Sequence, residues 1–192
     1  MAEPPCTDQG NAAVVYAESA AVEMYRFAAL MLGNEAEALS LVESTVARVE
    51  IDPCADPGAA NGLVRERVLD GALEIMHRQD PASFAKLPAT DPVGSCIEDD
   101  STVPLSGAEI SELVGETGRG PLREWLARLT QAQRAIFVQR AVLGSSNADT
   151  ARAINRHSRP SVWTAEAVSS LFRQALCSLA SSLVHAVPAA QV

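Results

Sequence analysis

The stretch that decides the fold runs from Thr130 to Leu183, TQAQRAIFVQRAVLGSSNADTARAINRHSRPSVWTAEAVSSLFRQALCSLASSL. Its pattern predicts three helices separated by turns. Thr130 and Gln133 have the spacing of a capping box, in which the hydroxyl accepts an amide proton at the start of a helix and the glutamine side chain reaches back to the N-cap amide. Apolar residues then continue at helical spacing as far as Gly144, which suits a left-handed cap at the end of this helix.

The second and third helices of this stretch have start signals of the same kind. Ser146 and Asp149 have the spacing of a second capping box. Thr164 is the predicted N-cap of the third helix, and Trp163 and Val168 flank it as a hydrophobic staple. The third helix then carries one apolar stripe, formed by Val168, Leu171, Phe172, Ala175, Leu179 and Leu183.

A helix, a short turn and a second helix containing the small residue Ala151 make the pattern of a helix-turn-helix, whose second helix can enter the major groove of DNA. The charge distribution favours the same conclusion. Residues 119–192 carry nine Arg and three Asp or Glu, a balance of +6, whereas residues 1–118 carry six Lys or Arg and 21 Asp or Glu, a balance of −15. The net charge of −9 therefore hides a basic C-terminal part, as expected of a nucleic-acid-binding domain.

The N-terminal part of the chain also has helical periodicity, and no stretch alternates as a strand would. Apolar residues recur at helical spacing from Asn11 to Leu32, where Gly33 ends the run, and Asn34 opens the next helix. Because so short a turn separates the two helices, we expect an antiparallel hairpin. The prolines and glycines of residues 51–62, IDPCADPGAANG, predict a loop.

We therefore predict an all-α protein with two small helical domains joined by a linker. The N-terminal domain is expected over residues 11–78, and its third helix over Leu63–Arg78. The linker is expected over residues 79–120, where prolines and an acidic run break the pattern and a short helix begins at Ser106. The C-terminal helix-turn-helix domain is expected over residues 121–185.

Composition also excludes several classes of protein. The four cysteines, Cys6, Cys54, Cys96 and Cys177, are far apart in the sequence, so we expect reduced thiols and no zinc site or disulfide framework. The acidic N-terminus does not resemble a signal peptide, and no apolar run approaches membrane-spanning length, so we expect a cytoplasmic protein without a membrane partner. No paired catalytic groups, phosphate-binding loop or metal-ligand spacing is present, and we expect no enzymatic activity and no cofactor or metal.

The segment Leu126–Asn155, LARLTQAQRAIFVQRAVLGSSNADTARAIN, resembles region four, the promoter-recognition domain of bacterial sigma factors of the extracytoplasmic-function type. The segment Val168–Leu179, VSSLFRQALCSL, resembles the recognition helix of that domain, and Tyr25–Val49 resembles two helices of region two. This resemblance implies two partners, the RNA polymerase core for the N-terminal helices and double-stranded promoter DNA for the C-terminal domain.

The resemblance also implies the contact residues. The family's polymerase-binding positions match Ser40, Glu43 and Ser44, although the residues found there differ from the usual ones. Arginines near the recognition helix are expected to contact phosphates, and exposed positions of that helix to contact bases. The candidate DNA-binding residues are Arg152, Arg156, Arg159, Thr164, Glu166, Ser169, Ser170 and Arg173.

The part of the chain that matches the promoter-melting region departs from the family. Between residues 51 and 104 there is one aromatic residue, Phe84, and only four Lys or Arg, whereas holding an unstacked base requires a stacking surface and a positive groove. Two interpretations follow. In the first, the protein is a sigma-factor-like regulator that binds DNA and RNA polymerase. In the second, it is a degenerate sigma-like module that binds an anti-sigma or other protein partner without initiating transcription. A helical interaction protein without a DNA role is a third alternative.

Overall fold

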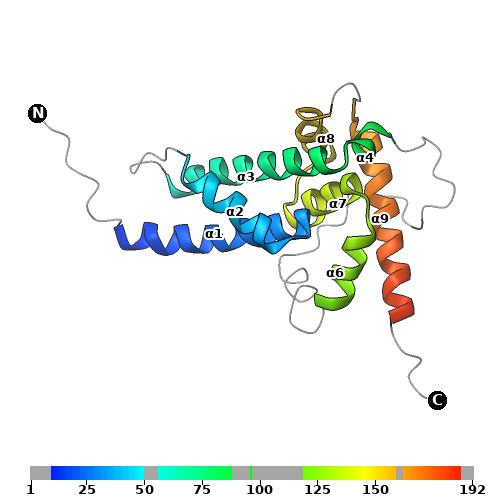
Figure 1. Ribbon diagram of the computed structural model, residues 1–192, viewed down its shortest axis with the longest axis horizontal. Coiled ribbons are helices and arrows are strands. Elements are labelled where there is room, and N and C mark those ends of the chain that lie inside the picture. The colour runs from blue at the N-terminus through cyan, green and yellow to red at the C-terminus, as the bar shows by residue number, and fades with distance from the viewer. Residues whose placement is uncertain (1–9, 50–55, 88–95, 97–118, 159–161, 187–192) are drawn as a thin grey trace, which may run out of the picture. The chain divides into compact units, whose positions relative to one another are not determined.

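The computed structural model describes residues 10–49, 56–87, 96, 119–158 and 162–186 (Figure 1). Every regular element in this part of the chain is a helix, which confirms the prediction of an all-α protein. For residues 10–19, 57, 119–121 and 183–186 the backbone alone is described. The chain divides into two compact units, Met1–Ala72 and Leu73–Val192, and the division falls inside a helix.

The first unit contains α1 (Gly10–Leu32), α2 (Glu35–Val46) and the beginning of α3 (Pro57–Gln79). Gly33, with φ +70°, ends α1, and the Asn34 side chain accepts hydrogen bonds from the backbone N–H groups of Ala36 at 3.0 Å and Glu37 at 3.2 Å. The predicted turn is therefore confirmed, and α2 folds back onto α1 (Figure 1). The core of this unit is formed by Met24, Phe27, Ala28, Met31, Leu32, Ala38, Val42, Val64, Val68 and Ala72.

The start of α3 corrects one expectation from the sequence. Residues 57–62 were expected in a loop, but they form the first turns of α3, which begins at Pro57. The carboxylate of Asp56 accepts a hydrogen bond from the backbone N–H of Ala59 at 2.9 Å, as an N-cap residue does, and proline fits the first helical position. The Asp-Pro pair therefore starts the helix in spite of the glycines that follow it.

Gly71 of α3 lies against the side chain of Leu41 of α2. A Cβ atom added to Gly71 would lie 2.6 Å from Cδ1 of Leu41, well inside van der Waals contact. The missing side chain therefore allows the two helices to approach each other here.

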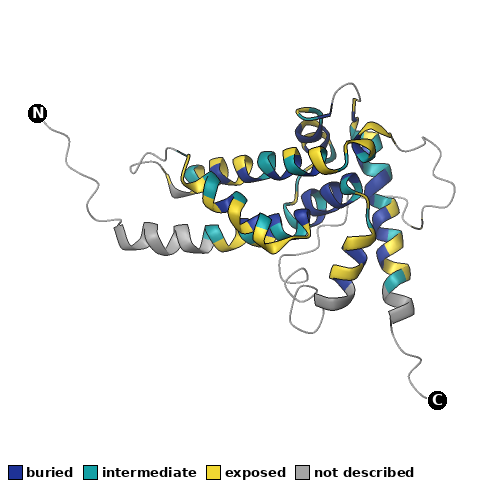
Figure 2. Ribbon diagram, in the orientation of Figure 1, coloured by how far each residue is buried: buried dark blue, intermediate teal, exposed yellow. Residues whose placement is uncertain are grey.

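The second unit contains the end of α3, α4 (Pro81–Ala85), α6 (Arg119–Arg128), α7 (Gln131–Phe137), the π-helical turn η1 (Val138–Val142), α8 (Asn147–Asn155) and α9 (Ala165–Ala186). Helix α9 packs against α6, α7 and α8, and α7 is largely buried (Figure 2). The Trp125 and Phe137 rings meet edge to face with centroids 4.8 Å apart, and Phe137 lies 6.2 Å from Phe172. Trp125 and Phe137 are thus core residues.

The predicted helix boundaries in this unit are largely confirmed. Thr130 and Gln133 make the complete capping box, and Gly144 has φ +65°. The Thr164 hydroxyl accepts a hydrogen bond from the Ala167 N–H at 3.2 Å. The last turn of the helix before Gly144 was expected to be α-helical and is instead π-helical, with the Leu143 N–H donating to the carbonyl of Val138, five residues earlier, at 3.1 Å.

Phe84, on α4, is a central anchor of the second unit. It is 1% exposed, and its ring meets His77 edge to face with centroids 5.5 Å apart. Its carbonyl accepts a hydrogen bond from the Trp163 indole N–H at 3.0 Å. Residues that the sequence assigned to the start of the linker therefore contribute to this core. The short helix expected from Ser106 lies outside the described residues.

Two cysteines contradict the expectation of reduced thiols. Cys96 and Cys177 form a disulfide although 81 positions separate them in the sequence. The folded chain brings their Cα atoms to 5.7 Å, a normal separation for a disulfide, and spacing in the sequence gives no sign of such a contact. Cys6 and Cys54 lie outside the described residues. Among the helices of the described chain, none is both long enough and apolar enough to cross a membrane.

Candidate DNA-binding and polymerase-binding surfaces

The connection between α8 and α9 is held at both ends by one side chain. The Asn155 amide donates to the carbonyl of Trp163 at 2.8 Å, and the Trp163 N–H donates to the Asn155 amide oxygen at 2.7 Å. Trp163 and Val168 are both buried, as a hydrophobic staple requires. The bonds between Asn155 and Trp163 fix where α9 begins relative to the end of α8.

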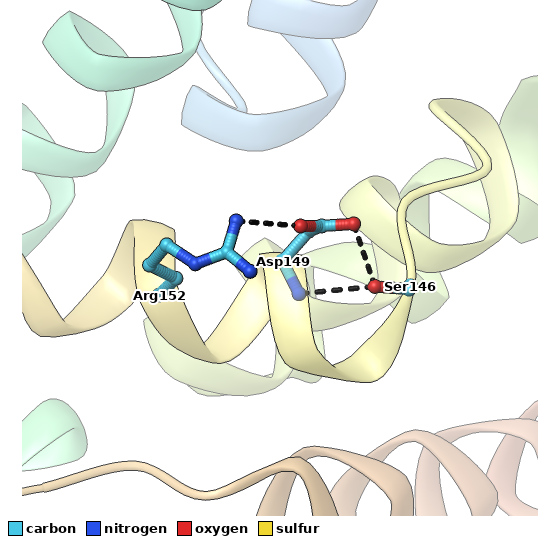
Figure 3. Close-up of polar contacts among 3 residues, drawn as sticks. All are labelled: Ser146, Asp149 and Arg152. Carbon is cyan, nitrogen blue, oxygen red and sulfur yellow. Dashed lines mark hydrogen bonds and ion pairs between the residues drawn. The ribbon is translucent and has the colours of Figure 1, made fainter.

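The solvent-exposed face of α8 carries two of the candidate phosphate-binding arginines. Arg152 and Arg156 are both exposed, while Ala151 and Ile154 face the core. Arg152 donates to the Asp149 carboxylate at 2.7 Å, and both side chains are more than half exposed (Figure 3). A phosphate would therefore have to compete with Asp149 for Arg152. Arg159, the third candidate, lies outside the described residues.

Asp149 is also bound to the N-cap of α8. Its backbone N–H donates to the Ser146 hydroxyl at 3.1 Å, and that hydroxyl donates to the Asp149 carboxylate at 2.6 Å (Figure 3). In the expected capping box the carboxylate would instead accept from the N-cap backbone amide. Hydrogen bonds from the Ser146 hydroxyl and, to a smaller extent, from Arg152 lower the pKa of the Asp149 carboxyl. The carboxylate therefore stays charged beside Arg152.

The candidate base-contacting residues lie along α9. Thr164 and Glu166 are exposed at its beginning, and Ser169, Ser170 and Arg173 are partly exposed. The pKa of the Glu166 carboxyl is lowered by a hydrogen bond from the backbone N–H of Glu166 and, to a smaller extent, by one from the Thr164 hydroxyl. Residues separated by three or four positions share a helix face. We use the name "polar stripe" for Glu166, Ser170, Arg173 and Cys177, which follow this spacing.

The candidate polymerase-binding residues lie on α2. Ser40 and Glu43 are exposed, whereas Ser44 is partly buried and its hydroxyl donates to the carbonyl of Leu41 at 3.0 Å. Leu39 and Val46 are 48% and 46% exposed, and together with Glu43 they follow the helical spacing of one face. We use the name "α2 docking face" for Leu39, Ser40, Glu43 and Val46. Sequence reasoning had not included its two apolar members, although their spacing was visible.

The described residues bring together no group of three His, Cys, Asp or Glu side chains that could hold a metal ion. Comparison with protein-family models, with curated proteins and with solved structures finds no match for this chain.

Proposed function

We propose that this protein is a sigma-factor-like transcription regulator, which binds duplex DNA through α8 and α9 and RNA polymerase through the α2 docking face. The observation that carries the proposal is the exposed polar surface of α8 and α9. Arg152 on α8 and Arg156 at its C-cap are exposed, the polar stripe on α9 is exposed at Glu166 and partly exposed at its other members, and all belong to the segment with a charge balance of +6. Exposed arginines of this kind bind phosphates, and a polar helix face can reach base edges.

The α2 docking face supports the polymerase contact. Leu39 and Val46 flank Glu43 on one side of α2 and remain about half exposed. An apolar pair with a charged residue between them is suited to pack against a helix of another protein, because the apolar residues supply buried area and the charge supplies orientation.

Promoter melting requires an aromatic surface on which an extruded base can stack. Phe84, the single aromatic residue between positions 51 and 104, is 1% exposed and forms part of a core. It offers no surface on which an extruded base could stack. We therefore propose that the protein binds DNA and polymerase without opening the duplex by itself.

The charge of the second unit favours the alternative function, a degenerate module that binds an anti-sigma or other protein partner. Residues 73–192 carry eleven Lys or Arg and twelve Asp or Glu, a balance of −1. The acidic residues between 88 and 118 thus offset the basic charge of residues 119–192. A nearly neutral unit gains little from long-range attraction to DNA, whereas a protein partner does not require a positive field.

The first experiment measures binding of the full-length protein to a fluorescent duplex at several salt concentrations. Arg156→Ala is expected to lower the affinity and to reduce the salt slope by about 0.9 for each phosphate that the variant no longer neutralises. Arg128→Ala is the matched control, because Arg128 is also an exposed arginine of the second unit but lies on α6, 3.8 Å from Glu124. Equal effects of the two substitutions, or no binding at low salt, would reject α8 as a DNA-binding surface.

The second experiment measures binding to the RNA polymerase core by pull-down. Glu43→Arg reverses the charge of the α2 docking face and is expected to weaken retention. Glu23→Arg, at an exposed position of α1, is the control and is expected to have no effect. Permanganate footprinting of the polymerase complex on DNA then tests melting, for which we expect no reactive thymines. Open complexes formed with the unmodified protein would contradict the proposed inability to melt DNA.

A further inference from the structure

Val162 is an exposed apolar residue just before the beginning of α9. Among the large apolar side chains that the structure describes, it has the highest exposed fraction, 67%, whereas the other exposed ones lie between 39% and 48%. It comes two residues before Thr164, which caps α9, and two residues of chain span at most about 7 Å. Val162 therefore lies beside the candidate base-contacting residues of α9, all of which are polar.

The backbone next to Val162 is held in place, although its side chain is in solvent. The N–H of the peptide bond between Val162 and Trp163 donates to the Asn155 amide oxygen at 2.7 Å. Trp163 is 2% exposed, and its indole N–H donates to the Phe84 carbonyl at 3.0 Å. Because Trp163 is anchored in this way, the position of Val162 is fixed from its C-terminal side. A side chain on a fixed backbone loses less entropy when it makes a contact.

The charges near Val162 indicate which part of a duplex it would meet. Glu166 is exposed in the first turn of α9, and the hydrogen bonds that lower its pKa keep the carboxylate charged. A carboxylate repels phosphates but accepts hydrogen bonds from base amino groups in the major groove. The exposed arginines Arg152 and Arg156 are suited to the phosphates instead. The beginning of α9 is thus suited to base edges.

The chemistry of the base edges identifies the group that fits Val162. In the major groove the bases present hydrogen-bond donors and acceptors and, on thymine, the C5-methyl group. A valine side chain can neither donate nor accept, so packing it on a polar edge would leave that edge without a partner, which costs free energy. Packing it on the thymine methyl group removes apolar surface of both from water. The residues at the beginning of a recognition helix are those that reach base edges.

We propose that Val162 is a specificity-determining residue, which packs against the C5-methyl group of a thymine in the major groove and makes the protein prefer duplexes with thymine at that position. This inference rests on the proposed DNA-binding function and names a feature of the DNA that is recognised. Removing one methyl group from such a contact is expected to change the affinity about fourfold, from the transfer free energy of one buried carbon group.

The test begins by selecting preferred duplexes from a random-sequence pool with the full-length protein at low salt. Each thymine of the selected duplex is then replaced singly by uracil, which keeps the hydrogen-bonding groups of thymine and lacks its methyl group. We expect one such replacement to lower the affinity about fourfold.

The Val162→Ala variant is then measured on the thymine and the uracil duplex. It is expected to bind both about as weakly as the unmodified protein binds the uracil duplex, because the partner of the methyl group is gone. The substitution is at an exposed position, so it leaves no cavity, and circular dichroism verifies that the variant is folded. Leu87→Ala is the matched control, because Leu87 is also an exposed apolar residue of the second unit, 42% exposed, but lies outside α8 and α9. It is expected to keep the preference for thymine.

The outcomes separate failure of this contact from failure of DNA binding. If no thymine of the selected duplex depends on its methyl group, or if Val162→Ala distinguishes thymine from uracil as well as the unmodified protein does, the role of Val162 is overturned and DNA binding stands. Equal weakening of Val162→Ala on the two duplexes, with the fourfold difference between them retained, would likewise show a contact that does not read the methyl group. If no duplex is bound at low salt, the proposed function fails and the role of Val162 fails with it.

Discussion

The two units of this protein hold their helices together by different means. In the first unit, α1, α2 and the start of α3 pack through aliphatic residues, methionines and Phe27, and α2 and α3 approach each other at Gly71. In the second unit, buried aromatic residues also make hydrogen bonds between distant parts of the chain. One example is the bond from the Trp163 indole N–H to the Phe84 carbonyl, 79 positions away. Directional bonds of this kind fix one arrangement, whereas apolar contacts tolerate small shifts.

This difference matches the two proposed roles. A surface that reads DNA requires fixed side-chain positions, and the α8–α9 connection is fixed by Asn155 and Trp163. The α2 docking face requires only an exposed apolar surface on a stable hairpin. The following predictions test whether the second unit depends on its polar anchors and the first on close packing.

The largest effect is expected at Trp163. Trp163→Ala removes a buried indole and its hydrogen bond to the Phe84 carbonyl, and we expect a loss of about 3–5 kcal/mol in the free energy of unfolding. Urea denaturation followed by circular dichroism measures it. Trp163→Phe keeps an aromatic ring but lacks the donor, and is expected to cost about 1–3 kcal/mol. A loss below about 1 kcal/mol for Trp163→Ala would mean that this anchor does not organise the second unit.

Asn155 is expected to have the next largest effect. Asn155→Ala removes both hydrogen bonds to the Trp163 backbone and is expected to cost about 1–3 kcal/mol, because partly buried backbone groups lose their partners. Asn155→Asp keeps the acceptor but loses the donor, so its stability should fall between that of Asn155→Ala and that of the unmodified protein. If the Asp and Ala variants unfold at the same urea concentration, the bond that the Asn155 side-chain oxygen accepts from the Trp163 N–H contributes nothing.

Two glycines of α3 test close packing in the first unit. A Cβ at Gly62 would meet no atom within 4 Å, whereas one at Gly71 would meet Leu41 at 2.6 Å. Gly62→Ala should therefore stabilise α3 by up to about 1 kcal/mol through helix propensity. Gly71→Ala should gain less or lose stability, because Leu41 has to move. Thermal unfolding of the two variants measures the difference, and equal gains would show that α2 and α3 do not depend on this contact.

The smallest effect is expected from the titration of Asp149. The Ser146 hydroxyl and Arg152 lower its folded-state pKa below the ordinary value of 3.8. The interaction therefore stabilises the folded protein above that pH and is lost as the pH falls through the folded-state pKa. Asp149→Asn should reduce the melting temperature slightly at pH 6, and the difference from the unmodified protein should shrink towards pH 3. Glu124→Gln, at another exposed ion pair of the second unit, serves as the control. A difference that is constant with pH would contradict this assignment.

The sequence predicted the helix boundaries best where a cap is local. The capping box of Thr130, the caps at Asn34 and Thr164 and the glycines at 33 and 144 all act within a few residues, so their pattern is visible in the chain itself. The prediction of a loop at residues 57–62 was wrong because the glycines were given more weight than the helix start signal of Asp56 and Pro57.

Long-range contacts could not be predicted from the same patterns. The bond from Trp163 to Phe84 and the disulfide from Cys96 to Cys177 join residues 79 and 81 positions apart, and no local spacing encodes either. The π-helical turn at Val138–Val142 also differs from an α-helix too little for apolar periodicity to reveal it. For the candidate surfaces, the exposed faces of α8 and α2 agree with helical periodicity, whereas the pairing of Arg152 with Asp149 required the structure.

The bonds between Asn155 and Trp163 have a consequence for how the segment between them can vary. The Asn155 side chain holds both ends of this segment together, and lengthening a segment with fixed ends costs little free energy. Insertions there would leave the start of α9 in place. A lineage could therefore gain or lose residues there while the helices on either side keep their register.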